Sequence, residues 1–188
     1  MSCIMMKFFI LFCFLLGAAS AQRVTFKNCE SDKSGYGTVN VIDIKDPILF
    51  PSNVSADIDI EVTKAFPEGA TVQLTVYRVF RLFGKDRHIK IPCVMKAGSC
   101  EYDVCKLLLK SSKPGATFDL CTVWPEGKPC VCPIPETNLR KENASLSFPT
   151  LPGLAKFLVS GNYAVNAKFI DPSDKQSFFC LDIKATLG

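Results

Sequence analysis

Cysteine and histidine are the residues whose numbers first limit the chemistry of this chain. Its 188 residues include ten cysteines and one histidine. Zinc sites need several cysteine or histidine ligands at defined spacings, and Cys130-Val131-Cys132 is too closely spaced for a usual zinc knuckle and has no partner histidine. The counts therefore favour disulfide bonds, and the sequence predicts neither a metal site nor a cofactor.

The candidate catalytic groups are His88 and the acids Asp57, Asp59 and Glu61. A cysteine–histidine nucleophile pair needs a free thiol, which paired cysteines do not provide, and His88 has no obvious serine partner. The three acids alternate with apolar residues. Paired carboxylates would suit glycoside hydrolysis, but a solvated strand face explains the same pattern. We therefore predict that the protein is not an enzyme.

The first 21 residues have the pattern of a secretory signal peptide. Lys7 precedes the apolar run Phe8 to Leu16, and small residues then end in Ala19-Ser20-Ala21, which suits signal peptidase. The alternative is an uncleaved membrane anchor over 4–21. Cleavage after Ala21 removes two cysteines and one lysine, so that eight cysteines and a net charge of +3 remain.

Eight cysteines in a secretory-pathway protein predict four disulfides, although their spacing leaves the connectivity open. Cys29 and Cys180 lie near the two ends of the chain, and the other six lie within 93–132 among several prolines. A bridge between the two ends would close a long loop and stabilise the fold by about 4–5 kcal/mol. Sequons at Asn53 and Asn143 predict exposed glycosylation sites.

Alternation of polar and apolar residues predicts an all-β fold for 22–188, as a single domain. A period of two is typical of strands with one solvated and one buried face. Clear cases are 57–63, 71–76, 163–169 and 179–187, and shorter strands are expected at 39–44, 89–91 and 146–148. Turn signals such as Pro67-Glu68-Gly69 separate them, so we predict a sandwich or barrel. Short helices are expected at 104–109 and 151–159.

Three apolar segments are hard to bury in a simple sandwich. Residues 79–83 are apolar on both faces of a strand, residues 153–159 are apolar but loop-like, and Trp124 lies in the cysteine-rich segment. One interpretation is that they fill the core or cover its ends. The other is that they form rims of a cavity or a patch that touches lipid. Composition leaves both interpretations open.

Several short motifs occur in an order that resembles one protein family. They are Phe26-Lys27-Asn28-Cys29, 46–55 (Asp-Pro-Ile-Leu-Phe-Pro-Ser-Asn-Val-Ser), Ile89-Lys90-Ile91-Pro92-Cys93, Gly98-Ser99-Cys100, 127–133 (Gly-Lys-Pro-Cys-Val-Cys-Pro), Ser160-Gly161-Asn162-Tyr163 and the closing segment that begins at Cys180. This set, which runs from about Phe26 to Gly188, resembles the MD-2-related lipid-recognition family of ML-domain proteins, and within it the activators of ganglioside hydrolysis.

The resemblance implies a fold and a function. The fold is an immunoglobulin-like β-sandwich opened into a β-cup around a large apolar cavity. The implied disulfides are Cys29–Cys180, Cys93–Cys100, Cys105–Cys132 and Cys121–Cys130. Such proteins are not enzymes. They lift a ganglioside-like glycolipid or a phospholipid from a membrane and present it to a soluble lysosomal hydrolase such as a β-hexosaminidase, or transfer it between membranes.

The implied partners are a glycosphingolipid or phospholipid, a membrane surface that is contacted peripherally and transiently, and a β-hexosaminidase-like hydrolase. No lysine–arginine cluster of the nucleic-acid-binding type is present. The implied location is the secretory pathway, either in lysosomes or secreted outside the cell. The alternative is a secreted carrier or receptor module for a sterol, fatty acid or microbial lipid that acts through a protein partner. A lysosomal enzyme or a disulfide-rich inhibitor is a third class.

Apolar residues of the strands and loops are the expected lipid contacts. They are Val72, Leu74, Val76, Phe80, Leu82, Phe83, Trp124, Leu154, Phe157, Leu158 and Val159. The chain departs from the family in a short loop between Cys121 and Cys130, in His88 and in the basic stretch 78–87. These departures lie where a hydrolase or a lipid headgroup would be recognised.

Overall fold

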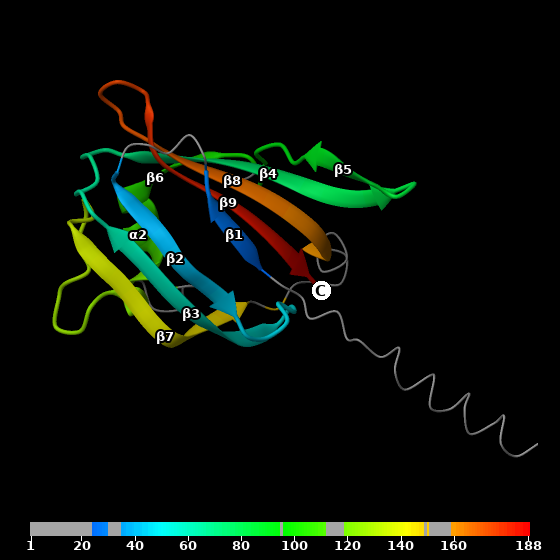
Figure 1. The fold of residues 1–188 in the computed structure, drawn as a ribbon, viewed down its shortest axis with the longest axis horizontal. Helices are drawn as coiled ribbons and strands as arrows, with labels where there is room; N and C mark the ends of the chain where they lie inside the picture. The colour runs from blue at the N-terminus through cyan, green and yellow to red at the C-terminus, as the bar shows by residue number, and fades with distance from the viewer. Residues whose placement is uncertain (1–23, 30–34, 95, 112–118, 149, 151–158) are drawn as a thin grey trace, which may run out of the picture.

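A computed structural model gives the fold as two antiparallel sheets that face each other (Figure 1). It describes residues 24–29, 35–94, 96–111, 119–148, 150 and 159–188. The strands are β1 (Thr25–Asn28), β2 (Gly37–Ile44), β3 (Ser52–Val62), β4 (Thr71–Leu82), β5 (Lys85–Lys90), β6 (Glu101–Asp103), β7 (Thr137–Phe148), β8 (Gly161–Ile170) and β9 (Ser177–Leu187). The fold is therefore the all-β sandwich that the sequence predicts.

The larger sheet has six strands, in the order β1-β9-β8-β4-β5, and β6 also pairs with β4. The smaller sheet has three strands, in the order β2-β3-β7. Alternation along β3 decides which face is buried, because Val54, Ala56 and Val62 point inward while Asp57 and Glu61 lie on the outer face. The two inner faces supply most of the core.

All seven predicted strands are longer than the sequence predicts, and two more, β1 and β6, were not predicted. β7 runs from Thr137 rather than from Leu146, and β5 begins at Lys85 rather than at Ile89. Three of the six side chains from Thr137 to Glu142 are exposed, and a register shift interrupts the pairing of β7 with β3 between Ala56 and Ile58. These features remove the regular alternation on which the prediction depends. The short strands β1 and β6 carry too few residues to give a period.

One side of the sandwich is closed by a polar clamp between the sheets. The side chain of Asn28 in β1 donates to the carbonyl oxygen of Val39 in β2 at 3.3 Å and accepts from its backbone amide at 3.3 Å. The two edge strands are thereby joined although they belong to different sheets. This contact satisfies backbone groups of β2 that would otherwise face the edge.

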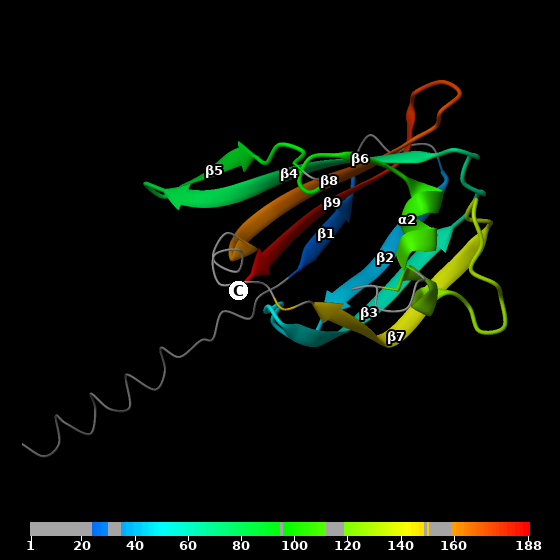
Figure 2. The same cartoon turned by 180° about the vertical axis from the view of Figure 1, so that it is seen from behind.

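The other side is closed by helix α2 (Val104–Ser111) and the 3₁₀ turn η1 (Leu120–Val123) (Figure 2). The carboxylate of Asp103 accepts from the backbone amide of Lys106 at 2.8 Å and so caps the start of α2. That backbone hydrogen bond is the main reason that the pKa of Asp103 lies below its usual value. Val104 and Leu108 are buried, so the predicted helix at 104–109 is confirmed.

Four disulfides hold these parts together, and they join Cys29 to Cys180, Cys93 to Cys100, Cys105 to Cys132 and Cys121 to Cys130. These are the pairings that the family resemblance implies. Two of them attach α2 and η1 to the segment before β7. The first joins β1 to β9 within the larger sheet, across 151 residues of sequence.

Strands β4 and β5 form a hairpin that projects beyond the smaller sheet (Figure 1). Leu82 pairs with Lys85, so the turn consists of Phe83 and Gly84 alone. Both residues have positive φ, 51° and 74°, which is the backbone of the tightest hairpin turns. The side chain of Phe83 is fully exposed at this tip.

Two predictions lie outside the described residues. They are the signal peptide at 1–21 and nearly all of the helix expected at 151–159.

Candidate functional site

An apolar cavity of about 220 Å³ lies between the two sheets. Its walls come from β3, β4, β7, β8 and β9, and α2 and η1 close it on one side. Every lining side chain is apolar: Ile60, Val62, Phe66, Val72, Val104, Leu107, Leu108, Leu120, Val123, Trp124, Ile134, Leu139, Phe169 and Phe179. A cavity without polar groups offers water no hydrogen-bond partners and therefore favours a hydrocarbon occupant.

The helical side of the cavity is fixed by disulfides and by a cap. Cys105 lies in α2 and Cys121 in η1, and both are bonded to cysteines in the segment that leads into β7. The carboxylate of Asp119 accepts from the amide of Cys121 at 2.9 Å and starts the 3₁₀ turn. This turn places Val123 and Trp124 at the cavity, and Trp124 is only 8% exposed.

Aromatic side chains form the adjoining part of the core. Phe66 contacts Phe178 edge-to-face with ring centroids 5.0 Å apart, and Phe169 in the same way at 5.6 Å. Tyr36 packs against Phe178 at 4.8 Å. Sequence reasoning did not find Phe66 because it precedes a Pro-Glu-Gly turn and belongs to no periodic segment.

The apolar lining continues along β3 from the cavity towards the opposite end of the smaller sheet. Ile60 lines the cavity, and Ile58 packs against both the main core and a second cluster built on Val54, Ala56 and Leu146. Ile44 and Phe148 flank this second cluster. The inner face of β3 is therefore apolar from Val54 to Val62.

The predicted lipid contacts occupy different parts of the molecule. Val72 and Trp124 line the cavity, and Leu74 packs against the main core. Val76 is half-buried on the same face of β4, two residues further along. Val159 is half-buried. Leu154, Phe157 and Leu158 lie outside the described residues.

Three further predicted contacts lie on the projecting hairpin and not in the cavity. Phe80 is 37% exposed, Leu82 is 53% exposed and Phe83 is fully exposed. Strand β4 extends past the end of the smaller sheet at this point (Figure 1), and no strand in the described part of the chain covers these residues. Their role in lipid binding remains a prediction, and the structure separates them from the cavity lining.

The acids of β3 lie on the solvated face, on the opposite side of the sheet from the cavity. Asp57 accepts from the backbone amide of Asn143 at 2.7 Å and pairs with Lys45 at 3.0 Å. The first of these contacts is the main reason that the pKa of Asp57 lies below its usual value. Asp59 pairs with Arg140 at 3.9 Å. These acids therefore act as surface ion-pairing groups.

Metal and membrane sites can be stated only for the described part of the chain. Within it, no group of three or more histidine, cysteine or acidic side chains is arranged to hold a metal ion. No helix there has both the length and the apolar character needed to cross a membrane. His88 is exposed on β5 and makes a ring contact with Tyr77 at 6.0 Å.

The predicted glycosylation sites are both exposed. Asn53 lies on β3, and Asn143 lies on β7 with a φ of 54° at the shift in register. The side-chain oxygen of Asn143 accepts from Lys45 at 2.6 Å.

The fold and the cavity define a class of protein, namely a disulfide-stabilised β-sandwich with an apolar interior site between its sheets. The family model of the ML domain matches residues 23–187. The chain therefore belongs to the ML-domain family, and this membership supports lipid binding.

Relatives with a similar sequence include two ganglioside GM2 activators. The ganglioside GM2 activator of Mus musculus is 28% identical over 164 residues, which are 87% of this chain and 81% of that protein. The ganglioside GM2 activator of Macaca fascicularis is 28% identical over 185 residues, with 92% and 91% covered. Their name is that of an activator, which supports a non-enzymatic role at the level of the family.

The solved structures have low identity and low TM-scores. A Niemann-Pick type C2 protein from the Japanese carpenter ant has 13% identity and a TM-score of 0.40, with 87% of this chain and 99% of that chain covered. Chicken MD-1 complexed with lipid IVa has 12% identity and a TM-score of 0.41, with 89% and 91% covered.

Proposed function

We propose that this protein is a non-enzymatic lipid carrier that extracts a ganglioside-like glycolipid or a phospholipid from membranes. It holds the hydrocarbon between its sheets and either presents the headgroup to a hydrolase or transfers the lipid to another membrane. The observation that carries this proposal is the wholly apolar cavity of about 220 Å³, which adjoins an inner sheet face that stays apolar along β3.

The energetic argument concerns the transfer of hydrocarbon from one apolar environment to another. Each methylene of an acyl chain that becomes exposed to water raises the free energy by about 0.8 kcal/mol. A soluble carrier can therefore remove a lipid from a bilayer only if it re-buries most of the chain. The apolar walls supplied by Val72, Leu108 and Leu139 provide such an environment for part of the chain, and the apolar inner face of β3 extends it beyond the cavity.

The hairpin supports transient contact with a membrane surface. Phe83 stands exposed at its tip, Leu82 lies beside it, and Arg81 and Lys85 flank the pair. An apolar tip with neighbouring cations is the composition of segments that enter the interface of an anionic bilayer. The same hairpin carries Phe80 on the inner face of β4, next to the opening between the sheets.

Similarity to ganglioside GM2 activators supports presentation to a hydrolase, and a β-hexosaminidase-like enzyme is the partner we propose. The alternative is a secreted carrier or receptor module for a sterol, fatty acid or microbial lipid that acts through a protein partner. The cavity volume favours this alternative in one respect. About 220 Å³ suits part of a single chain better than the two chains of a ceramide.

We also propose that residues 1–21 are a cleaved signal peptide and that 22–188 form one domain. Four disulfides fit an oxidising compartment, and both sequons are exposed. The protein would then pass through the secretory pathway as a glycoprotein and reside in lysosomes or outside the cell.

The experiment is mass spectrometry of organic extracts from the purified protein, followed by transfer of a fluorescent ganglioside between liposomes. We expect a stoichiometric lipid and saturable transfer. A sterol or fatty acid in the extract would favour the carrier alternative. An empty protein that also takes up no lipid from liposomes would contradict both.

Membrane contact is tested separately by flotation with vesicles that contain phosphatidylserine. We expect Phe83→Ser to weaken binding, because it removes the exposed ring from the interface. Leu109→Ser is the matched control, since Leu109 is 62% exposed on α2, away from the hairpin. Equal binding by both variants would argue against a hairpin anchor.

A further inference from the structure

We infer that the outer face of the six-stranded sheet is a docking surface for an acidic segment of a partner protein. This face lies on the opposite side of the sheet from the lipid cavity. The inference therefore goes beyond lipid binding and does not depend on it.

The first observation is a polar groove across the outer face. Two adjoining hollows, of about 280 and 300 Å³, share His88 of β5 and Lys184 of β9. The first also includes Arg81 of β4 and Thr186 of β9. The second extends to Lys27 of β1. Because the two hollows together are lined by residues of β1, β9, β8, β4 and β5, the groove crosses the sheet and is suited to an extended segment.

The second observation is the charge balance of the groove. Its two acids are already engaged: Asp86 pairs with Arg81 at 4.0 Å, and Asp182 pairs with Lys27 at 3.8 Å. Among the described residues Lys184 has no ion pair, although it lines both hollows. The unpaired lysine leaves the groove with a net positive charge that favours an anionic partner.

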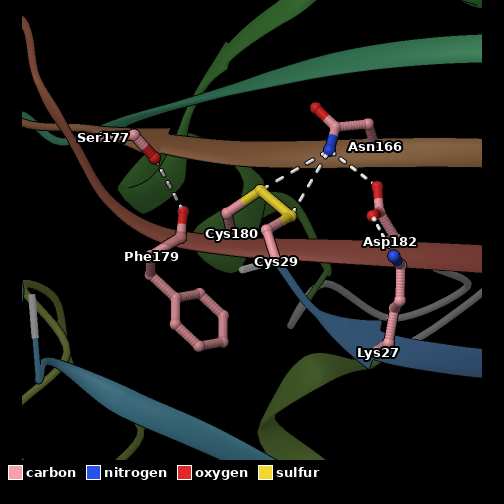
Figure 3. The surroundings of a disulfide bond; sticks show 7 residues. All are labelled: Lys27, Cys29, Asn166, Ser177, Phe179, Cys180 and Asp182. Atoms are coloured by element: carbon pink, nitrogen blue, oxygen red, sulfur yellow. Dashed lines mark hydrogen bonds and ion pairs between the residues drawn. A yellow bond between two sulfur atoms is a disulfide. The ribbon is translucent and has the colours of Figure 1, made fainter. Parts of the chain in front are cut away.

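The environment of the disulfide explains why Asp182 does not neutralise this charge (Figure 3). The amide nitrogen of Asn166 donates to the Asp182 carboxylate at 2.8 Å and lies 3.5 Å from the sulfurs of Cys29 and Cys180. Lys27 approaches the other side of the same carboxylate. Asp182 of β9 is therefore held in the floor of the groove by one neighbour on β8 and one on β1.

The third observation is the difference between the two outer faces of the sandwich. Asn53 and Asn143, the two sequons, both lie on the smaller sheet, and that face also carries Asp57, Asp59 and Glu61. Glycans attached there would cover the outer face of the smaller sheet and leave the basic face of the larger sheet open. The side from which an acidic partner can approach is therefore the larger sheet.

A protein segment fits this groove better than a membrane does. Along β4 and β5 the large exposed apolar side chains, Phe80, Leu82 and Ile89, lie on the inner side, because Ile89 pairs with Arg78 and alternates with His88. The groove itself is concave and polar. Bilayer binding needs apolar groups that project into the interface, and those groups point the other way.

The test is an NMR titration of the ¹⁵N-labelled protein with a hexaglutamate peptide at low ionic strength. We expect the amide shifts to cluster on β4, β5, β8 and β9. The double variant Arg81→Glu with Lys184→Glu should raise the Kd of the peptide about tenfold, because two attractive contacts become repulsive. Both side chains are on the surface, and the fold of the variant is checked by its Tm.

The matched control makes the same change in net charge elsewhere, with Lys110→Glu and Lys128→Glu near the cavity end of the molecule. It should leave the Kd within about twofold of the parent. Equal losses in both variants, shifts spread over the whole surface, or no shifts at all would overturn the inference. Loss of binding to phosphatidylserine vesicles without loss of peptide binding would overturn it in favour of a membrane.

Discussion

The volume of the interior cavity predicts how affinity depends on the length of a bound hydrocarbon chain. If each chain carbon takes about 30 Å³, close to the volume share of one water molecule in the liquid, then 220 Å³ holds about seven carbons. Burial of each methylene contributes about 0.8 kcal/mol. The Kd should therefore fall about fourfold per carbon, and the slope should flatten beyond about seven carbons.

The assay is a fluorescence titration with n-alkyl phosphocholines of increasing length, kept below their micelle concentrations. Trp124 is the single tryptophan of the chain and lines the cavity, so its emission reports occupancy directly. An affinity that does not change over the short chains would refute the assignment of the cavity as the hydrocarbon site. A slope that continues unchanged to the longest chains would refute the volume argument.

A pair of variants tests whether the flattening point is set by the cavity. Ile60→Phe adds roughly three side-chain carbons at a half-buried position of the lining and should move the flattening point to about four carbons. Val41→Phe places the same ring at an exposed position of β2 and should leave the flattening point at about seven carbons. If the flattening point shifted equally in both variants, the added ring would act through overall stability and not through the volume of the cavity.

Two further predictions concern stability. Replacing Cys29 and Cys180 by alanine opens a loop of 151 residues and should lower the free energy of unfolding by about 5 kcal/mol. The same change at Cys93 and Cys100, separated by 7 residues, should lower it by about 2.4 kcal/mol. Urea unfolding followed by tryptophan emission measures both free energies, and equal losses would contradict the loop argument. The pKa of Asp57 is lowered by its hydrogen bond to Asn143 and by Lys45, so its contribution is present above the unfolded pKa and is lost as pH falls through the folded pKa. The Tm difference between the parent and Asp57→Asn should therefore shrink as the pH is lowered below about 4, and a constant difference would contradict this assignment.

The buried face of each strand could be predicted where the sequence alternates without interruption. Along 57–63 every second residue is apolar, and in the structure these residues point to the core while the acids face solvent. The helix at 104–109 was also predictable, because Val104 and Leu108 lie one turn apart on a single face.

The walls of the cavity were harder to predict because several come from segments without a period. Leu120, Val123 and Ile134 lie between cysteines and prolines, and their positions depend on which cysteines are joined. Spacing alone does not decide that pairing. Among the predicted lipid contacts that fall in the described part of the chain, Val72 and Trp124 line the cavity.

Burial of the residues on the β4–β5 hairpin could not be predicted from the sequence, for a different reason. Residues 79–83 carry an apolar pattern that continues β4, but the pattern does not reveal where the opposite sheet ends. Phe80 and Leu82 keep the inward direction of Val72 and yet are exposed, since no described strand of the smaller sheet lies across from them. Burial at such positions is decided by tertiary structure and not by local sequence.

Pairing of the first and last strands has a consequence for biosynthesis. Among the described strands β1 pairs with β9 alone, and β9 also pairs with β8 and carries Cys180, the disulfide partner of Cys29. During synthesis β1 leaves the ribosome first and stays without its neighbour until the residues around Cys180 follow. The larger sheet is therefore completed after translation and not strand by strand. A chain that ends before Ser177 would contain every strand of the smaller sheet but would lack β9. The inner faces of both sheets would then be exposed.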